Sequence, residues 1–96
     1  MRLADHQRAT IRETVRLTAG ADVCAYVFGS RLDDSAKGGD LDLLLSADRR
    51  LDLLTRARVK AAVETAIGLP VDVVAYQTGS VPSAFQEIAL ARALPL

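Results

Sequence analysis

Apolar and polar residues alternate along the first half of the chain in patterns that predict a helix followed by two strands. Between residues 3 and 18 the apolar positions recur at helical spacing, and Gly20 is placed to end this helix. Residues 23–28 and 40–45 are rich in aliphatic and aromatic side chains, which favours two buried strands. The polar segment between them is therefore expected to be a loop.

The second half of the chain predicts a long helix, a third strand and a closing helix. The long helix is expected to run from about residue 49 to 67, with Ser46 or Asp48 as its N-cap, and to be stopped by Gly68 and Pro70. The valine-rich residues 71–75 form the third predicted strand. Residues 83–86 have the spacing of a capping box, which starts a helix that reaches about residue 94.

Each predicted helix carries apolar positions that we expect to face a core. They are Ile11, Val15 and Leu17 in the first helix, Leu51, Leu54, Val59, Ala62, Val63 and Ala66 in the second, and Phe85, Ile88, Ala89 and Leu90 in the third. A chain of 96 residues is long enough for a single domain, residues 1–96, with one core of two layers. It is too short for a separate domain that binds a second substrate.

Composition narrows the range of partners and compartments. Twelve basic and twelve acidic residues balance, so nothing favours a DNA or RNA polymer as a partner. No apolar stretch is long enough for a membrane span or a signal core, and we expect a cytoplasmic protein. Cys24 stands alone in an apolar run, which predicts a packed thiol in a reducing compartment. His6 has no second His or Cys near it in the sequence, so a metal role is not expected.

The first predicted strand ends in Gly29-Ser30, a pair suited to binding a phosphate group. Glycine lets the backbone turn sharply and approach a ligand closely, and the serine adds a hydroxyl group to the free backbone N–H groups. Arg31 follows directly. It can contact a triphosphate, or it can pair with Asp33 or Asp34 at the surface, and the sequence leaves both interpretations open.

Two carboxylates converge at the start of the second predicted strand. Side chains alternate between the faces of a strand, so Asp40 and Asp42 point to one side while the intervening leucines point to the other. Like charges on one face repel each other, and a hard divalent cation such as Mg²⁺ would neutralise them. Asp72 is the only charged residue of the third strand. It either faces water at a sheet edge or completes the acidic cluster.

These residues together resemble a known family signature. Gly29-Ser30, followed by Gly39-Asp40-Leu41-Asp42 and a hydrophobic run, is similar to the Gly-Ser…Asp-x-Asp signature of the DNA polymerase beta-like nucleotidyltransferases, most closely their minimal nucleotidyltransferase (MNT) group. Val71-Asp72-Val73-Val74 falls where the family carries its third carboxylate, so the resemblance covers nearly the whole chain. Many relatives carry a serine where this chain has Gly39, and any contact made by that hydroxyl is absent here.

The resemblance implies both a fold and a set of site residues. The fold is α/β (α+β), a small mixed β-sheet with helices packed on it, as in the palm of polymerase beta. The implied catalytic and metal-binding residues are Asp40, Asp42 and Asp72, and the implied nucleotide-binding residues are Gly29, Ser30 and Arg31. Three carboxylates on one side of a sheet would hold two Mg²⁺ or Mn²⁺ ions about 3.5–4 Å apart, the arrangement used for in-line displacement at phosphorus. Asp72 would take the proton of the attacking hydroxyl.

The resemblance also implies a partner. MNT proteins are commonly encoded beside HEPN-domain toxins and act as antitoxins that transfer AMP from ATP to a hydroxyl of the toxin, which would make the complex a hetero-oligomer. An MntA-like antitoxin of this kind needs no acceptor domain of its own. Two other functions stay open: a nucleotide-binding antitoxin that acts by complex formation without catalysis, and a nucleotidyltransferase for a small molecule such as an aminoglycoside. A purely structural domain is the remaining alternative.

The basic residues of the two longer helices have a simpler interpretation. Arg8, Arg12 and Arg16 recur every four residues and so line one helical face, which is either solvated or available to a phosphate or partner. The basic residues in and before the second helix are interpreted as solvated surface, and they are Arg49, Arg50, Arg56, Arg58 and Lys60.

Overall fold

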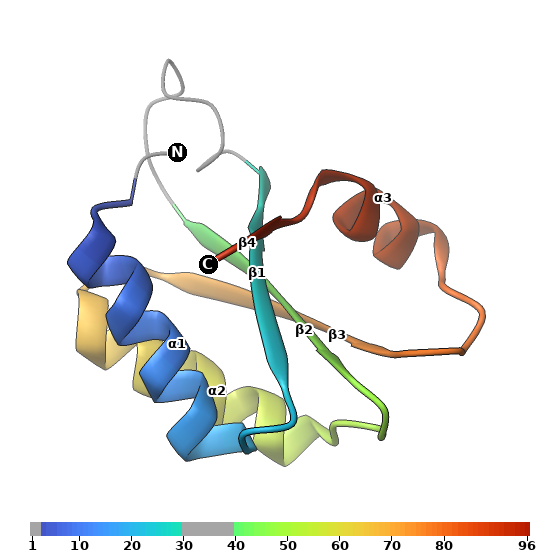
Figure 1. Ribbon diagram of the computed structural model, residues 1–96, viewed down its shortest axis with the longest axis horizontal. Coiled ribbons are helices and arrows are strands. Elements are labelled where there is room, and N and C mark those ends of the chain that lie inside the picture. The colour runs from blue at the N-terminus through green and yellow to red at the C-terminus, as the bar shows by residue number, and fades with distance from the viewer. Residues whose placement is uncertain (1–2, 30–39) are drawn as a thin grey trace.

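The computed structural model describes residues 3–29 and 40–96, which contain a four-stranded mixed sheet in the order β3-β2-β1-β4 (Figure 1). Strands β1 (Cys24–Phe28) and β2 (Leu41–Ala47) are antiparallel, and β3 (Val71–Gln77) runs parallel to β2. The connection from β2 to β3 is helix α2 (Leu53–Ile67), because parallel neighbours need a crossover. In these residues no helix has both the length and the apolar character that crossing a membrane requires.

Helices cover both faces of the sheet. Helix α1 (Asp5–Ala19) and helix α2 pack on one face, and helix α3 (Ala84–Arg92) lies over the other (Figure 1). Alternation along β2 sends Leu41, Leu43 and Leu45 into the α1–α2 layer, where all three are fully buried. Leu44 points the opposite way and forms a second, smaller cluster with Phe28 and Ala89. The sheet is therefore apolar on both faces.

Helix α1 follows the predicted pattern with one exception. Ile11 and Val15 are buried in the larger core, and the Gly20 N–H donates to the carbonyl oxygen of Arg16 at 3.1 Å, which ends the helix as predicted. The prediction for Leu17 was wrong, because its side chain is exposed. Two residues correspond to about 200° around a helix, so position 17 cannot share a face with Val15.

Helix α2 begins later than the sequence suggested. Its N-cap is Asp52, whose carboxylate accepts the Thr55 N–H at 2.8 Å, so the prediction of Ser46 or Asp48 as the cap was wrong. Strand β2 continues to Ala47 and includes Ser46. Of the six core positions predicted for this helix, Leu51 is buried ahead of it, Val59 and Val63 are buried within it, Ala62 is half-buried, and Leu54 and Ala66 are exposed.

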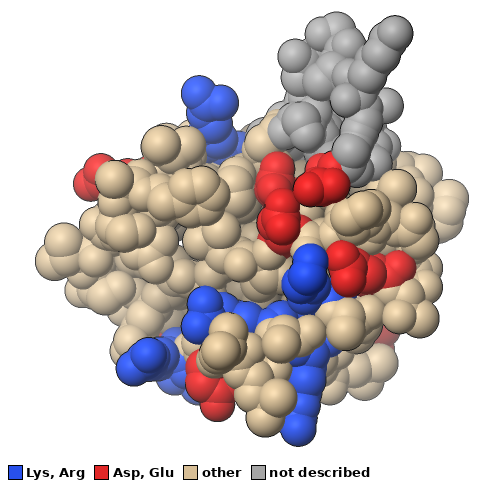
Figure 2. All heavy atoms as spheres, turned by 180° about the vertical axis from the view of Figure 1, so that it is seen from behind, with Lys and Arg blue, Asp and Glu red and all other residues tan. Residues whose placement is uncertain are grey.

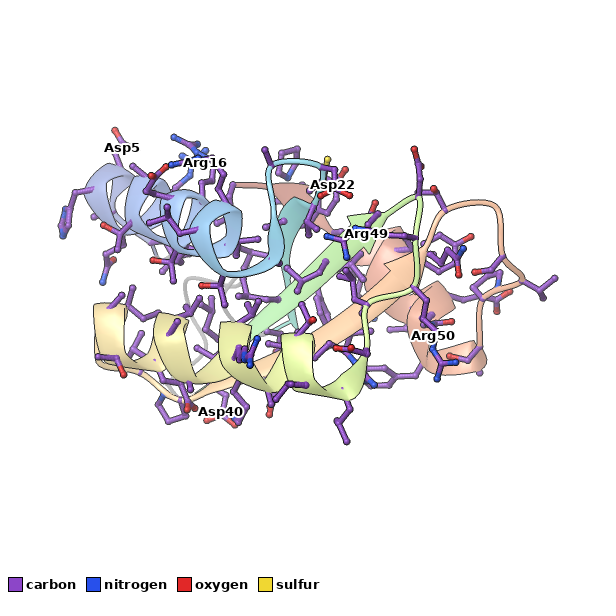
Figure 3. The ribbon with its side chains drawn as sticks, turned by 90° about the horizontal axis from the view of Figure 1, so that it is seen from below. Asp5, Arg16, Asp22, Asp40, Arg49 and Arg50 are labelled. Atoms are coloured by element: carbon purple, nitrogen blue, oxygen red, sulfur yellow. The ribbon has the colours of Figure 1, made fainter. Side chains whose placement is uncertain are left out.

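Arg49 ties the end of β2 to the turn between α1 and β1, where the sequence predicted solvated surface. Its Nε donates to Oδ2 of Asp22 at 2.8 Å, and its Nη2 donates to the carbonyl oxygen of Ala19 at 2.6 Å (Figure 3). The hydrogen bonds from Arg49 lower the pKa of Asp22 below the ordinary aspartate value. A planar guanidinium can hold a carboxylate and a carbonyl group at once.

Fewer side chains are buried between α3 and the sheet than the sequence predicted. Cys24 is exposed, so the prediction of a packed thiol was wrong. Of the apolar stripe predicted on α3, only Ala89 is buried, whereas Phe85, Ile88 and Leu90 are exposed. The two-residue strand β4 (Leu94–Pro95), which pairs with β1, was not predicted, because a segment this short carries no periodicity.

The capping box predicted at the start of α3 is confirmed and gives a test of the fold. Ser83 Oγ accepts the Gln86 N–H at 3.1 Å, and the Gln86 side chain accepts the Ser83 N–H at 2.8 Å. We expect Ser83→Ala to lower the free energy of unfolding by about 1 kcal/mol, as measured by urea denaturation. Ser83→Asp keeps an acceptor and should stay near the wild-type value. Equal losses in the two variants would show that the cap is not what stabilises α3.

Candidate functional site

Three carboxylates approach one another at one end of the sheet. Asp42 in β2 lies in register with Asp72 in β3 on one side and with Phe28 in β1 on the other. Partners in register share a face, so the side chains of Asp42 and Asp72 lie on the α3 side of the sheet, and Asp40 directly precedes β2 two residues from Asp42. Acidic side chains gather on one side of the molecule above a group of basic ones (Figure 2).

The negative charge of Asp42 is destabilised by its surroundings. Its side chain is half-buried, whereas Asp40 and Asp72 are exposed. Burial raises the pKa of Asp42 above the ordinary aspartate value, and the negative charges of Asp72 and then Asp40 raise it further. The folded chain therefore holds a carboxylate where positive charge would stabilise it.

Gly29 and Asp42 occupy adjoining space. Gly29 follows β1 with a φ of +83°, a conformation that L side chains rarely adopt. A Cβ atom at this position would lie 2.2 Å from Oδ2 of Asp42. The start of the predicted phosphate loop thus contacts the central carboxylate directly, and only glycine fits there.

The start of β3 is fixed by two side chains of α2. The Val71 N–H donates to Oε2 of Glu64 at 2.9 Å, and Lys60 Nζ donates both to the Val71 carbonyl oxygen and to Glu64. The Val71 N–H and then Lys60 lower the pKa of Glu64. Because Asp72 is the next residue, this arrangement sets its place beside Asp42. The sequence interpretation missed it, although the spacing of Lys60 and Glu64 was a signal for their pairing.

The donor set fits a divalent ion that arrives with a phosphate group. Within residues 3–29 and 40–96 no three His, Cys, Asp or Glu side chains are arranged so that they could hold a metal ion. Mg²⁺ in nucleotide sites is usually held by one or two carboxylates together with substrate phosphates and water, so a closed protein cage is not required. Asp42, which contacts Gly29, together with Asp72 or Asp40 provides carboxylates of this kind.

The other predicted site residues fall into two groups. Ser30 and Arg31 lie outside the described residues, so their phosphate contacts stay predictions. The arginine row of α1 is used for local contacts: Arg8 and Arg16 pair with acidic residues three positions earlier, and Arg12 Nη1 donates to the Leu96 carbonyl oxygen at 2.8 Å. Arg12 therefore links Leu96 to α1, whereas Arg8 and Arg16 make contacts within the helix. Asp5 and Arg16 lie on the outer surface of this helix (Figure 3).

The contact between Gly29 and Asp42 can be tested against a matched glycine. Gly79 has almost the same φ, +86°, with no atom within 4 Å of an added Cβ. We expect Gly79→Ala to lower the free energy of unfolding by about 1–2 kcal/mol through backbone strain alone. Gly29→Ala should cost about 1–3 kcal/mol more, because its methyl group displaces the carboxylate. Urea denaturation of both variants, repeated in an Asp42→Ala background, should show this excess only when Asp42 is present.

The comparisons with known proteins agree on one family. The family model described as polymerase beta, nucleotidyltransferase matches residues 19–94. A solved structure described as a minimal nucleotidyltransferase is 33% identical, with a TM-score of 0.68 over 95% of this chain and 90% of that chain. No curated protein matches the chain.

Two toxin–antitoxin complexes share the fold at lower identity. A chain of the MntA–HepT complex has a TM-score of 0.71 and 18% identity over 94% of this chain and 68% of that chain. A chain of the complex between a tri-AMPylated Shewanella oneidensis HEPN toxin and its MNT antitoxin has a TM-score of 0.72 and 19% identity over the same shares. The predicted α/β fold, a small mixed sheet with packed helices, is confirmed. The chain belongs to the polymerase beta-like nucleotidyltransferase family, within its minimal nucleotidyltransferase group.

Proposed function

We propose that this protein is a metal-dependent nucleotidyltransferase that transfers AMP from ATP to a hydroxyl group of a partner protein. The observation that carries the proposal is the position of Asp42. Its half-buried carboxylate lies in register with Asp72 and against Gly29, so the carboxylates that we propose as metal ligands adjoin the start of the proposed phosphate loop. A site that combines the two is suited to a nucleoside triphosphate bound with a divalent ion.

The residues of the chain have separate roles in the proposed reaction. Bound Mg²⁺ ions would neutralise phosphate charge and lower the pKa of the acceptor hydroxyl. Asp40, Asp42 and Asp72 would hold the ions together with the substrate phosphates and water, and Gly29 with Ser30 and Arg31 would bind the β- and γ-phosphates. The acceptor oxygen forms a bond to the α-phosphorus while the bond from that phosphorus to the bridging oxygen breaks. Asp72 takes the hydroxyl proton, and pyrophosphate leaves.

A protein acceptor is supported by the charge of the chain and by the complexes in which proteins of this fold occur. The net charge of zero does not favour a nucleic acid as acceptor. Proteins of the same fold occur in complexes between an MNT antitoxin and a HEPN toxin, one of them with a tri-AMPylated toxin. We therefore propose a HEPN-type toxin as the partner and acceptor, and antitoxin action by its AMPylation.

Metal binding is tested with a charge-removing substitution and a distant control. Mg²⁺ with ATP should raise the melting temperature of the wild type and of Asp5→Asn, whose carboxylate lies on the surface of α1, but not that of Asp42→Asn. Without ligand, Asp42→Asn should be as stable as the wild type or more stable at neutral pH, because it removes a charge opposed by burial and by Asp72 and Asp40. An equal Mg²⁺-dependent shift in Asp42→Asn would refute the assignment.

The same substitution predicts a change in pH dependence. The pKa of Asp42 is raised in the folded state, so the folded chain binds more protons than the unfolded chain in that range. This group therefore lowers wild-type stability as the pH rises through the ordinary aspartate pKa and beyond it. In urea denaturation, the free energy of unfolding of Asp42→Asn minus that of the wild type should rise between about pH 3 and pH 7, because this difference isolates Asp42 from the other carboxylates.

The transfer itself is tested with the product of the neighbouring gene, which we expect to be a HEPN-type toxin, as acceptor. Incubation with ATP and Mg²⁺ should add an adenylyl group to a Tyr, Ser or Thr of that protein, detectable by mass spectrometry, and Asp42→Asn should abolish the addition. A partner that is bound and inhibited equally by the wild type and by Asp42→Asn, without modification, would replace this proposal with a non-catalytic antitoxin. Transfer to an aminoglycoside instead would identify a small-molecule enzyme.

A further inference from the structure

An aromatic ring is exposed to solvent near the carboxylates. The chain has only four aromatic residues, and Phe85 is the one whose side chain is largely exposed, at 59%. It is the second residue of α3, and its ring packs edge to face against Phe28, with ring centroids 6.4 Å apart and an interplanar angle of 74°. Leaving a phenyl ring this exposed forgoes most of the stabilisation that burial would give it.

The position of Phe85 is defined by the sheet register. Phe28 is paired with Asp42, directly precedes Gly29, and lies on the same face of the sheet as the carboxylates. Paired residues of antiparallel strands have Cα atoms about 5 Å apart, so Phe28 lies beside Asp42, and the Phe85 ring packs on Phe28. Phe85 therefore contacts the side chain that neighbours both Gly29 and Asp42.

The position of the Phe85 ring is fixed by Phe28 and by the first turn of α3. Phe28 is buried in the small cluster with Leu44 and Ala89, so it is a fixed support. The first turn of α3 is fixed by the Ser83 cap and by Gln86, whose Nε2 donates to the Ala75 carbonyl oxygen at 2.9 Å. Because Ala89 already fills the contact of α3 with the sheet, the core does not require a phenyl group at position 85.

We propose that Phe85 is the stacking platform for the base of the bound nucleotide. The inference rests on the proposed function, since it requires the phosphates to bind beside Gly29 and Asp42. An aromatic ring that is largely exposed and supported by Phe28, the residue before Gly29, suits a purine or pyrimidine ring. Stacking does not read the hydrogen-bonding edge of a base, so Phe85 strengthens the binding of any nucleoside triphosphate.

Binding of ATP and of inorganic tripolyphosphate, both with Mg²⁺, separates base contacts from phosphate contacts. In calorimetric titrations Phe85→Leu should weaken ATP binding about tenfold and leave tripolyphosphate binding within about twofold of the wild type. Phe85→Trp keeps an aromatic ring and should bind ATP with the affinity of the wild type. Ile88→Ala removes another exposed apolar side chain of α3 and should change neither affinity.

The outcomes distinguish this inference from the proposed function. Unchanged ATP affinity in Phe85→Leu, with tripolyphosphate binding that depends on Asp42, would refute the stacking role and leave the phosphate site intact. Parallel loss of both ligands in Phe85→Leu would show that the residue only supports the fold of the site, and would also refute stacking. Unchanged ATP affinity with lost transfer to the protein acceptor would place Phe85 in acceptor binding instead. A wild type that binds neither ligand would refute both proposals.

Discussion

The carboxylate of Asp42 is held in a position that costs free energy, and the leucines beside it supply the compensation. Leu41, Leu43 and Leu45 are fully buried against α1 and α2, and full burial of one such side chain contributes about 1.5–3 kcal/mol. Because side chains alternate along a strand, burying these leucines forces Asp42 onto the opposite face. The apolar stripe therefore decides where the charge lies, and the charge has no freedom to move into water by a shift of register.

The neighbours of Asp42 follow from the same strand. Antiparallel pairing with β1 brings Gly29 against its carboxylate, and parallel pairing with β3 brings Asp72 alongside. The second pairing depends on α2, which returns the chain to the same end of the sheet and fixes Val71 through Glu64 and Lys60. The site thus forms around β2 and its two neighbours. Strand β1 is antiparallel to β2, and β3 is parallel to it and joined to it through α2.

The candidate site lies on the face of the sheet that carries α3. Helix α3 covers it only in part, so Phe28 is buried while Phe85 and Ile88 stay exposed. This partial cover leaves Asp40 and Asp72 exposed, as the proposed binding of a nucleotide and an acceptor requires. The same incomplete cover explains why Cys24, on this face of β1, is accessible to solvent.

The sequence by itself determined the order of the main elements and the carboxylates of the candidate site. Leucines alternating with Asp40 and Asp42 define one face of a strand, and Gly20, Gly68 and the capping box at Ser83 define helix ends, because these signals act between residues close in the chain. Ser30 and Arg31 stay predictions from the sequence alone.

Tertiary structure decided what depends on contacts between distant segments. Asp72 had two interpretations until β3 was placed in parallel register with β2, which makes it both an edge residue and a neighbour of Asp42. The exposure of Leu17, Leu54 and Phe85 could not be read from apolar character, since burial depends on which helix face meets the sheet. Arg49 and the start of β3 are fixed by partners 7 to 30 residues away, beyond the spacing of neighbours within one helix or strand.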